Sequence, residues 1–240
     1  MALKLITLDL DNTLWETDPV ILRAEKASFD YLVQSCPAVA DLYDADSFNQ
    51  YRKDLAECYP SLRHQVSKLR LETLRRVCLQ IGCDRDEAAR IADEAFAVFY
   101  AERSRLDLFE GALEALQLMS DQYPLIALTN GNANTEQAGI RHLLVEHFNA
   151  EQTGAAKPAP DLFLAALQHA GVEAHEVLHI GDHPEQDIDA ARKLGMQTLW
   201  VNVLGQSWPD NQLPPQWQLD HWRDLPSLLS RLVASLETHD

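Results

Sequence analysis

The sequence predicts an α/β fold: a doubly wound, mostly parallel sheet with an inserted α-helical domain. From about residue 108 onward, short apolar segments alternate with segments of helical periodicity, as in a parallel sheet covered on both faces. One further apolar segment, residues 3–10, stands apart near the start of the chain. The residues between have helical periodicity and almost no glycine, so we expect a helical domain to interrupt the α/β unit after its first strand.

The expected elements follow in chain order. Residues 3–10 are mainly apolar and run into two aspartates, which predicts a buried strand. The next region predicts helices near 19–34, 44–59, 61–82 and 84–103. The later apolar runs predict strands at 124–132, 176–182 and 197–203, and the periodic runs predict helices at 111–123, 135–148, 161–172, 187–195 and 224–236. The Rossmann-like core should comprise residues 1–14 and 108–240, and the helical domain residues 15–107.

Composition narrows the possible functions. The net charge of −17 argues against non-specific binding to nucleic acid or to anionic membranes, because both require lysine and arginine. No segment resembles a signal peptide, and no apolar run is long enough to span a bilayer. The four cysteines form no C-x-x-C pair, and the nine histidines form no zinc motif. We therefore expect a cytoplasmic protein with reduced thiols and no zinc site.

Polar residues follow several of the predicted strands. Asp9 and Asp11 follow the first strand, Thr129 and Asn130 the next, and Asp182 a later one. Since the carboxyl ends of parallel strands meet at one edge of a sheet, these residues should converge there. Asp9 and Asp11 could instead cap a turn or helix after the strand, since Asp-Asn-Thr is good turn chemistry. The third carboxylate favours the alternative, a Mg²⁺ site in which oxygen ligands surround the cation.

Phosphate is the substrate group that best suits such a site. An aspartate can attack phosphorus, and a neighbouring aspartate can protonate the leaving alkoxide. Thr129, the backbone at Asn130 and the lysine at 157 offer donors for phosphate oxygens. Asp187, at a helix start, could support the metal shell. Each residue also has an ordinary interpretation: Thr129 and Asn130 as caps of the following helix, and Lys157 as a solvated surface lysine.

Four segments in this order resemble the motifs of the haloacid dehalogenase (HAD) superfamily: DLDNT at 9–13, TN at 129–130, KP at 157–158 and GDHPEQD at 181–187. The resemblance implies that Asp9 is the nucleophile and Asp11 the general acid/base. It implies that Thr129 and Lys157 bind the transferring phosphoryl group. Mg²⁺ would then be held by the side chains of Asp9 and Asp182 and the backbone carbonyl of Asp11. The helical insertion resembles the C1-type cap of that superfamily.

Within the superfamily, the segments TLDLDNTLW, PVILRAE, PLIALTNGNA and EVLHIGD resemble bacterial phosphatases of the riboflavin pathway. Those enzymes act on 5-amino-6-(5-phospho-D-ribitylamino)uracil and on FMN, so we expect a small cytosolic phosphate ester as substrate. The dehalogenase branch lacks an acidic residue two positions after the nucleophile, whereas this chain has Asp11. Three alternatives remain: a sugar-phosphate phosphatase, a phosphomutase of the same superfamily, and a catalytically retired binding module.

The helical domain carries a basic segment at residues 61–76. Arg63 and Arg70 are seven residues apart, as are Lys68 and Arg75, so on one helix each pair would lie near one face. This face could attract an anionic substrate, or it could simply be solvated. Trp15 could stack on a planar heterocycle, or it could pack against the first helix of the domain. Monomer and homodimer are equally compatible with the sequence.

Overall fold

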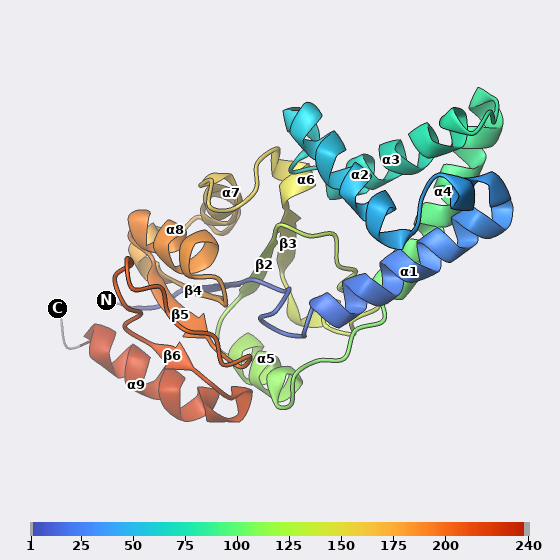
Figure 1. The fold of residues 1–240 in the computed structure, drawn as a ribbon. Helices are drawn as coiled ribbons and strands as arrows, with labels where there is room; N and C mark the ends of the chain where they lie inside the picture. The colour runs from blue at the N-terminus through green and yellow to red at the C-terminus, as the bar shows by residue number, and fades with distance from the viewer. Residues whose placement is uncertain (1, 238–240) are drawn as a thin grey trace. The chain divides into compact units, whose positions relative to one another are not determined.

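The computed structural model describes residues 2–237. The chain forms two compact units: an α/β unit that runs up to Glu16 and resumes at Asp107, and a helical unit, Thr17–Leu106 (Figure 1).

Six strands within the described residues form one parallel sheet, in the order β3-β2-β1-β4-β5-β6. The strands are β1 (Leu5–Leu8), β2 (Leu125–Thr129), β3 (Glu146–Asn149), β4 (Val177–Gly181), β5 (Gln197–Val201) and β6 (Gln218–Leu219). Every residue of β1, β2 and β4 is buried, as expected for central strands covered on both faces. The doubly wound, Rossmann-like fold predicted from the sequence is confirmed, and all of its strands are parallel.

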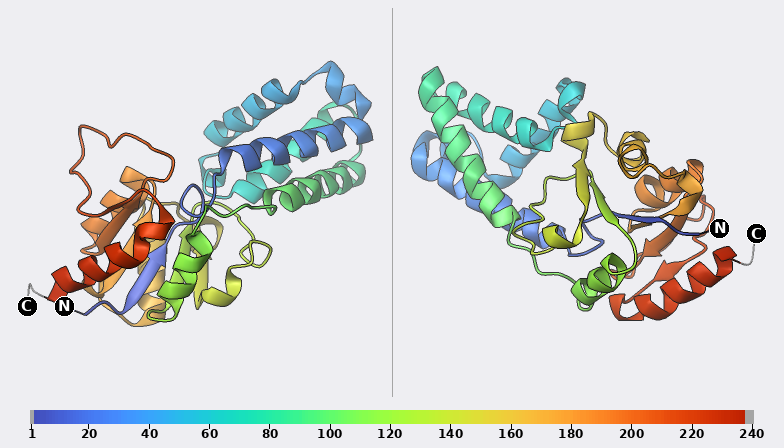
Figure 2. Two further views of the ribbon diagram at one scale, coloured as in Figure 1. Left: turned by 90° about the horizontal axis from the view of Figure 1, so that it is seen from below. Right: turned by 180° about the vertical axis from the view of Figure 1, so that it is seen from behind.

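Helices cover both faces of this sheet (Figures 1 and 2). They are α5 (Ala112–Ser120), α6 (Ala150–Thr153), α7 (Asp161–Ala170), α8 (Ala190–Lys193) and α9 (Leu225–Glu237), with a π-helical turn at Pro184–Asp189. One face packs its strand residues Leu5, Ile126 and Leu128 against Phe163 of α7 and Ala191 of α8. α5 and α9 lie on the opposite face.

The helical unit is built from α1 (Asp18–Ser35), α2 (Ala45–Cys58), α3 (Val66–Gln80) and α4 (Arg85–Arg103). Local chemistry explains two of the helix starts. Asp44 and Ser47 form a capping box at α2, and the Asp84 side chain accepts two backbone N–H groups at the start of α4. The buried residues include Leu32, Leu74 and Ile91, which form a core of the unit's own.

One predicted helix is wrong. Residues 135–148 form turns, a short 3₁₀ helix at Arg141–Leu143 and strand β3. Gly139 has φ +74°, a left-handed conformation that interrupts a helix. From Val145 onward the backbone pairs with β2 instead. Helical periodicity in this stretch was overridden by the open edge of the sheet, where β2 offers hydrogen-bond partners to the backbone of β3.

A smaller difference concerns the edge strand β6. β6 is only two residues long, and no apolar run predicted it. Among the described residues, no helix is both long and apolar enough to cross a membrane.

Candidate active site

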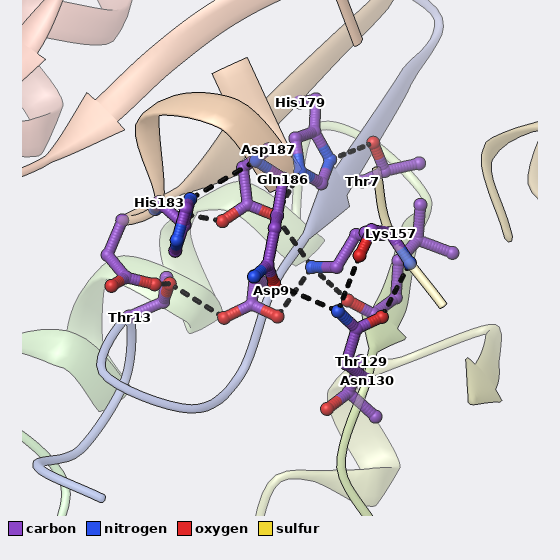
Figure 3. A network of polar contacts seen from close by, with 12 residues as sticks. Thr7, Asp9, Thr13, Thr129, Asn130, Lys157, His179, His183, Gln186 and Asp187 are labelled. Atoms are coloured by element: carbon purple, nitrogen blue, oxygen red, sulfur yellow. Dashed lines mark hydrogen bonds and ion pairs between the residues drawn. The ribbon is translucent and has the colours of Figure 1, made fainter. Parts of the chain in front are cut away.

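The strand order brings three of the predicted segments together. β1 lies between β2 and β4, so Asp9, Thr129 and Asp182 stand at the carboxyl ends of neighbouring strands, on the same edge of the sheet. Figure 3 shows Asp9 and Thr129 at this edge. This is the edge at which doubly wound folds bind ligands. Asp9 is 6% exposed, Thr129 1% and Asp182 9%, so water screens their interactions little.

Asp9 is held at both carboxylate oxygens. Lys157 Nζ donates to Asp9 Oδ1 at 2.6 Å, and Thr13 Oγ1 lies 3.0 Å from Asp9 Oδ2. The same Thr13 hydroxyl lies 3.2 Å from Asp182 Oδ1, so it bridges the two aspartates. Burial, opposed by Lys157 and reinforced by Asp187, raises the pKa of Asp9 to about 7. Burial and the neighbouring Asp9 raise the pKa of Asp182 to about 8.

Lys157 uses all three of its ammonium hydrogens on the protein. Its Nζ donates to Asp9 Oδ1, to Asp187 Oδ1 at 2.6 Å and to the backbone oxygen of Leu128 at 2.8 Å. Burial alone would disfavour this ammonium, but Asp187 and Asp9 outweigh it and raise the pKa of Lys157. The carboxyl of Asp187 keeps its charge: burial works against it, yet Lys157 and His179 hold the pKa below its ordinary range.

The cluster carries more negative charge than its own lysine can balance. Side-chain oxygens of Asp9, Asp182 and Asp187 lie within 4.8 Å of one another, a spacing that can hold a metal ion. Three carboxylates lie near the single ammonium of Lys157, and the pKa values of Asp9 and Asp182 are raised first by burial and then by their neighbouring carboxylates. A donor set made of carboxylate oxygens fits a hard divalent cation.

Asp11 and Trp15 are paired with each other. The indole Nε1 of Trp15 donates to Asp11 Oδ1 at 2.9 Å. Trp15 has no exposed surface, so its ring offers no free face to a heterocycle, and the prediction of a stacking role is corrected. Asn12 between them has φ +60°, the left-handed conformation that a short polar side chain tolerates, and it turns the chain after Asp11.

Thr129 and Asn130 differ in the hydrogen-bonding groups that they leave for a ligand. Thr129 Oγ1 accepts the backbone N–H of Gly131 at 2.9 Å, which leaves its own hydrogen for another acceptor. The side chain of Asn130 is fully engaged. It accepts the backbone N–H of Lys157 at 2.7 Å and donates to the backbone oxygen of Lys157 and to Gln186. Asn130 therefore fixes the loop that carries Lys157.

Arg63 and Arg70 do not share the helical face expected from their spacing. Arg63 lies before α3, which begins at Val66, and its side chain donates to the backbone oxygen of Ala56. Lys68 is exposed on α3. Arg70 is paired with Glu25 and lies over the ring of Phe99 at 3.5 Å. The prediction that Arg63 and Arg70 share a helical face is wrong, because the helix starts later than its periodicity suggested.

Several residues of the site were missed by sequence reasoning. Thr13 stands inside the DLDNT segment, where a hydroxyl four residues after Asp9 was a usable signal. Trp200 Nε1 donates to the backbone oxygen of Asp182 at 2.6 Å, which helps to fix that turn. His179 and Thr7 lie beneath the cluster and gave no sequence signal, because both occupy apolar strands.

A family model described as haloacid dehalogenase-like hydrolase matches residues 3–195, which contain this whole cluster. The chain belongs to the haloacid dehalogenase-like hydrolases. The family assignment expected from the four motifs is thereby confirmed.

Relatives of this HAD-like hydrolase include several phosphatases. The 5-amino-6-(5-phospho-D-ribitylamino)uracil phosphatase YigB of Escherichia coli is 31% identical, over 93% of this chain and 95% of its own length. A glyceraldehyde 3-phosphate phosphatase of Methanopyrus kandleri is 25% identical, over 96% of this chain and 99% of its own. A crystal structure of a 2-haloacid dehalogenase from Pseudomonas syringae has a TM-score of 0.89 and 35% identity, covering 96% of this chain and 99% of that one.

Proposed function

We propose that this HAD-like hydrolase, a phosphoric monoester hydrolase, is a Mg²⁺-dependent phosphatase that acts through an aspartyl-phosphate on a small phosphate ester. The observation that carries the chemistry is the position of Asp9: a buried carboxylate held by Lys157 and Thr13, next to Asp182. The substrate we propose is 5-amino-6-(5-phospho-D-ribitylamino)uracil, with FMN as a further substrate. The similarity to the Escherichia coli enzyme over nearly the whole chain supports this choice.

In the proposed reaction, a carboxylate oxygen of Asp9 attacks phosphorus and the ester oxygen leaves. Asp11 donates the proton that this oxygen needs and later takes a proton from the water that attacks phosphorus. That attack breaks the bond between the Asp9 oxygen and phosphorus, which restores the Asp9 carboxylate and releases inorganic phosphate. The indole N–H of Trp15 holds Asp11 in place for both steps. Thr129 offers its free hydroxyl hydrogen to a phosphoryl oxygen, and Lys157 keeps the Asp9 carboxylate oriented.

The metal fits the residues present. Mg²⁺, when bound, would neutralise the charge that the carboxylates and the phosphoryl group bring together. We assign Asp9 and Asp182, with the backbone carbonyl of Asp11, as its ligands. Asp187 has a supporting place, since its two oxygens already accept hydrogen bonds from Lys157 and from the backbone N–H of His183.

For the helical unit we propose the part of a C1-type cap, with residues 15–107 as its extent. Arg63, Lys68 and Arg70 are the residues we nominate for substrate attraction, with Arg70 the least free of them because it is paired with Glu25. Alanine variants should raise KM where the residue takes part. An unchanged KM in all three would remove the helical unit's basic residues from substrate binding. We further propose cytoplasmic localisation, in keeping with a small cytosolic ester as substrate.

A dehalogenase is the second candidate, favoured by the structural similarity to a 2-haloacid dehalogenase. Asp11 argues against it, because carbon–halogen displacement needs no acid to protonate a leaving alkoxide. The glyceraldehyde 3-phosphate phosphatase among the relatives keeps sugar phosphates as alternative substrates.

The deciding experiment measures inorganic phosphate and halide release from one panel, with Mg²⁺ or with EDTA. The panel contains the ribitylaminouracil phosphate, FMN, a triose phosphate, a hexose phosphate and a 2-haloacid, with Asp9→Asn protein as the blank. We expect Mg²⁺-dependent phosphate release that the blank lacks, with the highest kcat/KM for the ribitylaminouracil phosphate. Halide release alone would establish the dehalogenase. Release of neither product would indicate a phosphomutase or a binding module.

A further inference from the structure

Beneath the proposed nucleophile, a chain of buried polar contacts crosses from β1 to β4 (Figure 3). Thr7 and His179 are paired residues of these two adjacent strands, and Thr7 Oγ1 lies 2.9 Å from His179 Nδ1. His179 Nε2 lies 3.3 Å from Asp187 Oδ1. The same Asp187 oxygen receives Lys157 Nζ at 2.6 Å, and Lys157 Nζ in turn reaches Asp9. Thr7 and His179 have no exposed surface.

The positions of the hydrogens follow from the partners. Asp187 Oδ1 is an acceptor because it takes a hydrogen from Lys157. His179 Nε2, which faces the same oxygen, must therefore carry its hydrogen, because two acceptors would repel each other. A neutral imidazole then has a bare Nδ1, which accepts from the Thr7 hydroxyl. The Asp187 oxygen thus selects the tautomer in which His179 Nε2 donates to it, and Thr7 supports that tautomer by donating to Nδ1.

Two further features fix this arrangement in space. The imidazole of His179 lies edge-on to the ring of Phe163 from α7, with ring centroids 4.9 Å apart, so it has little room to rotate. Gly181 leaves the space that Asp187 occupies, because a Cβ there would lie 2.4 Å from Asp187 Cγ. The Asp187 carboxylate is therefore confined from two sides and aimed at Lys157.

We propose that His179 is a positioning residue: its Nε2–H orients Asp187, Asp187 anchors Lys157, and Lys157 fixes the carboxylate that attacks. Thr7 acts one step further back: it donates to Nδ1 and so supports the imidazole tautomer that Asp187 selects. The effect on turnover rests on the proposed phosphatase function, whereas the tautomer is a property of the folded chain alone. A plain apolar side chain would fill the same space without a buried polar group to satisfy, so packing by itself does not account for a histidine here.

The first test is kinetic. His179→Leu should lower kcat by about 10- to 100-fold with KM nearly unchanged, as is typical when a partner of a catalytic group is removed. His179→Gln, which keeps an N–H near the position of Nε2, should recover most of the loss. His169→Leu is the matched control, because the exposed His169 lies edge-on to Phe148 in the same way but contacts no carboxylate. Equal activity of the Leu, Gln and wild-type forms at position 179 would overturn the proposal, as would equal loss in Leu and Gln.

The second test needs no turnover. In wild-type protein with ¹⁵N-labelled histidine and EDTA, His179 should show a pyrrole-type Nε2 signal and a pyridine-type Nδ1 signal. Thr7→Val should weaken that preference, since the donor to Nδ1 is gone. The opposite tautomer in wild-type protein would overturn the proposal. If the wild type releases no phosphate while the expected tautomer is seen, the proposed function fails and the hydrogen-bonded arrangement stands.

Discussion

The two units of the molecule bury charged groups in different ways. In the α/β unit, three carboxylates surround one ammonium, and Lys157 is 3% exposed and Asp187 1%. In the helical unit, Arg52 and Arg70 share one oxygen of Glu25, and these three side chains are 12–15% exposed. Burial, with the nearby Arg52, lowers the pKa of Arg70 to about 9.

This difference distinguishes a candidate ligand site in the α/β unit from a structural ion-pair cluster in the helical unit. The α/β cluster has an excess of negative charge, little access to water and a raised pKa at two carboxyls, so it gains most from a cation. The helical cluster has an excess of positive charge, since two arginines pair with one glutamate, and its side chains stay partly exposed to solvent. Its Arg70 is additionally stabilised by the ring of Phe99. Four predictions test this contrast.

Lys157→Met should have the largest effect on stability. It leaves the buried carboxylates of Asp9 and Asp187 without their shared cation, and breaking such a pair costs about 3–5 kcal/mol. Urea unfolding in EDTA should show this loss, and phosphate release should be abolished. Lys193→Met, at an exposed lysine of α8, is the control and should change stability by less than about 0.5 kcal/mol. A loss of similar size in both variants would contradict the buried-pair assignment.

Metal-free protein should lose stability as pH rises from about 6.5 to 8.5. In this range folded Asp9 and Asp182, with pKa values of about 7 and about 8, release protons that the unfolded chain has already released. The folded state therefore binds more protons, and the free energy of unfolding falls, by about 1–3 kcal/mol. The lowered pKa of His179 acts in the opposite sense, but only below about 6.5.

The measurement is urea unfolding at several pH values in EDTA, repeated with Mg²⁺. The cation should flatten the dependence, because it takes the place of the protons. A stability that stays constant across this range in EDTA would show that Asp9 and Asp182 are already ionised without a metal.

Glu25→Gln should have a smaller effect, confined to the helical unit. Arg52 and Arg70 would keep a neutral acceptor but lose the carboxylate, and part of the cost is screened because all three side chains reach solvent. We expect a loss of about 1–2 kcal/mol in the free energy of unfolding. A loss as large as that of Lys157→Met would mean that the two clusters are equally sealed from water.

Lys26→Ala should have the smallest effect. Lys26 and Asp30 form an ion pair on α1, and their side chains are 73% and 59% exposed. Such surface pairs contribute less than about 0.5 kcal/mol, so thermal unfolding should be nearly unchanged. A clear drop in Tm would indicate that exposure is a poor guide to the strength of ion pairs in this unit.

The sequence determined the fold class and nominated most residues of the candidate site. Alternating apolar and helical segments are enough to predict a parallel α/β sheet, since each central strand must be buried on both faces. Asp9, Thr129 and Asp182 could be nominated because they follow strands of that sheet, and Lys157 because it stands in one of the four motifs. Long, regular helices such as α4 were also predicted from the periodicity of their apolar residues.

Only the tertiary structure decided which residues lie together and which partners each side chain has. The strand at Glu146–Asn149 depends on the open edge beside β2, which local periodicity does not encode. Trp15 proved to be a buried partner of Asp11, and Arg63 to lie outside α3, because burial and helix ends depend on distant packing. The contact of His179 with Asp187 joins a strand to the turn that follows it, and Thr7 adds a residue 172 positions away. The contact between Thr7 and His179 has no local signal in the chain, since only the pairing of β1 with β4 brings the two residues side by side.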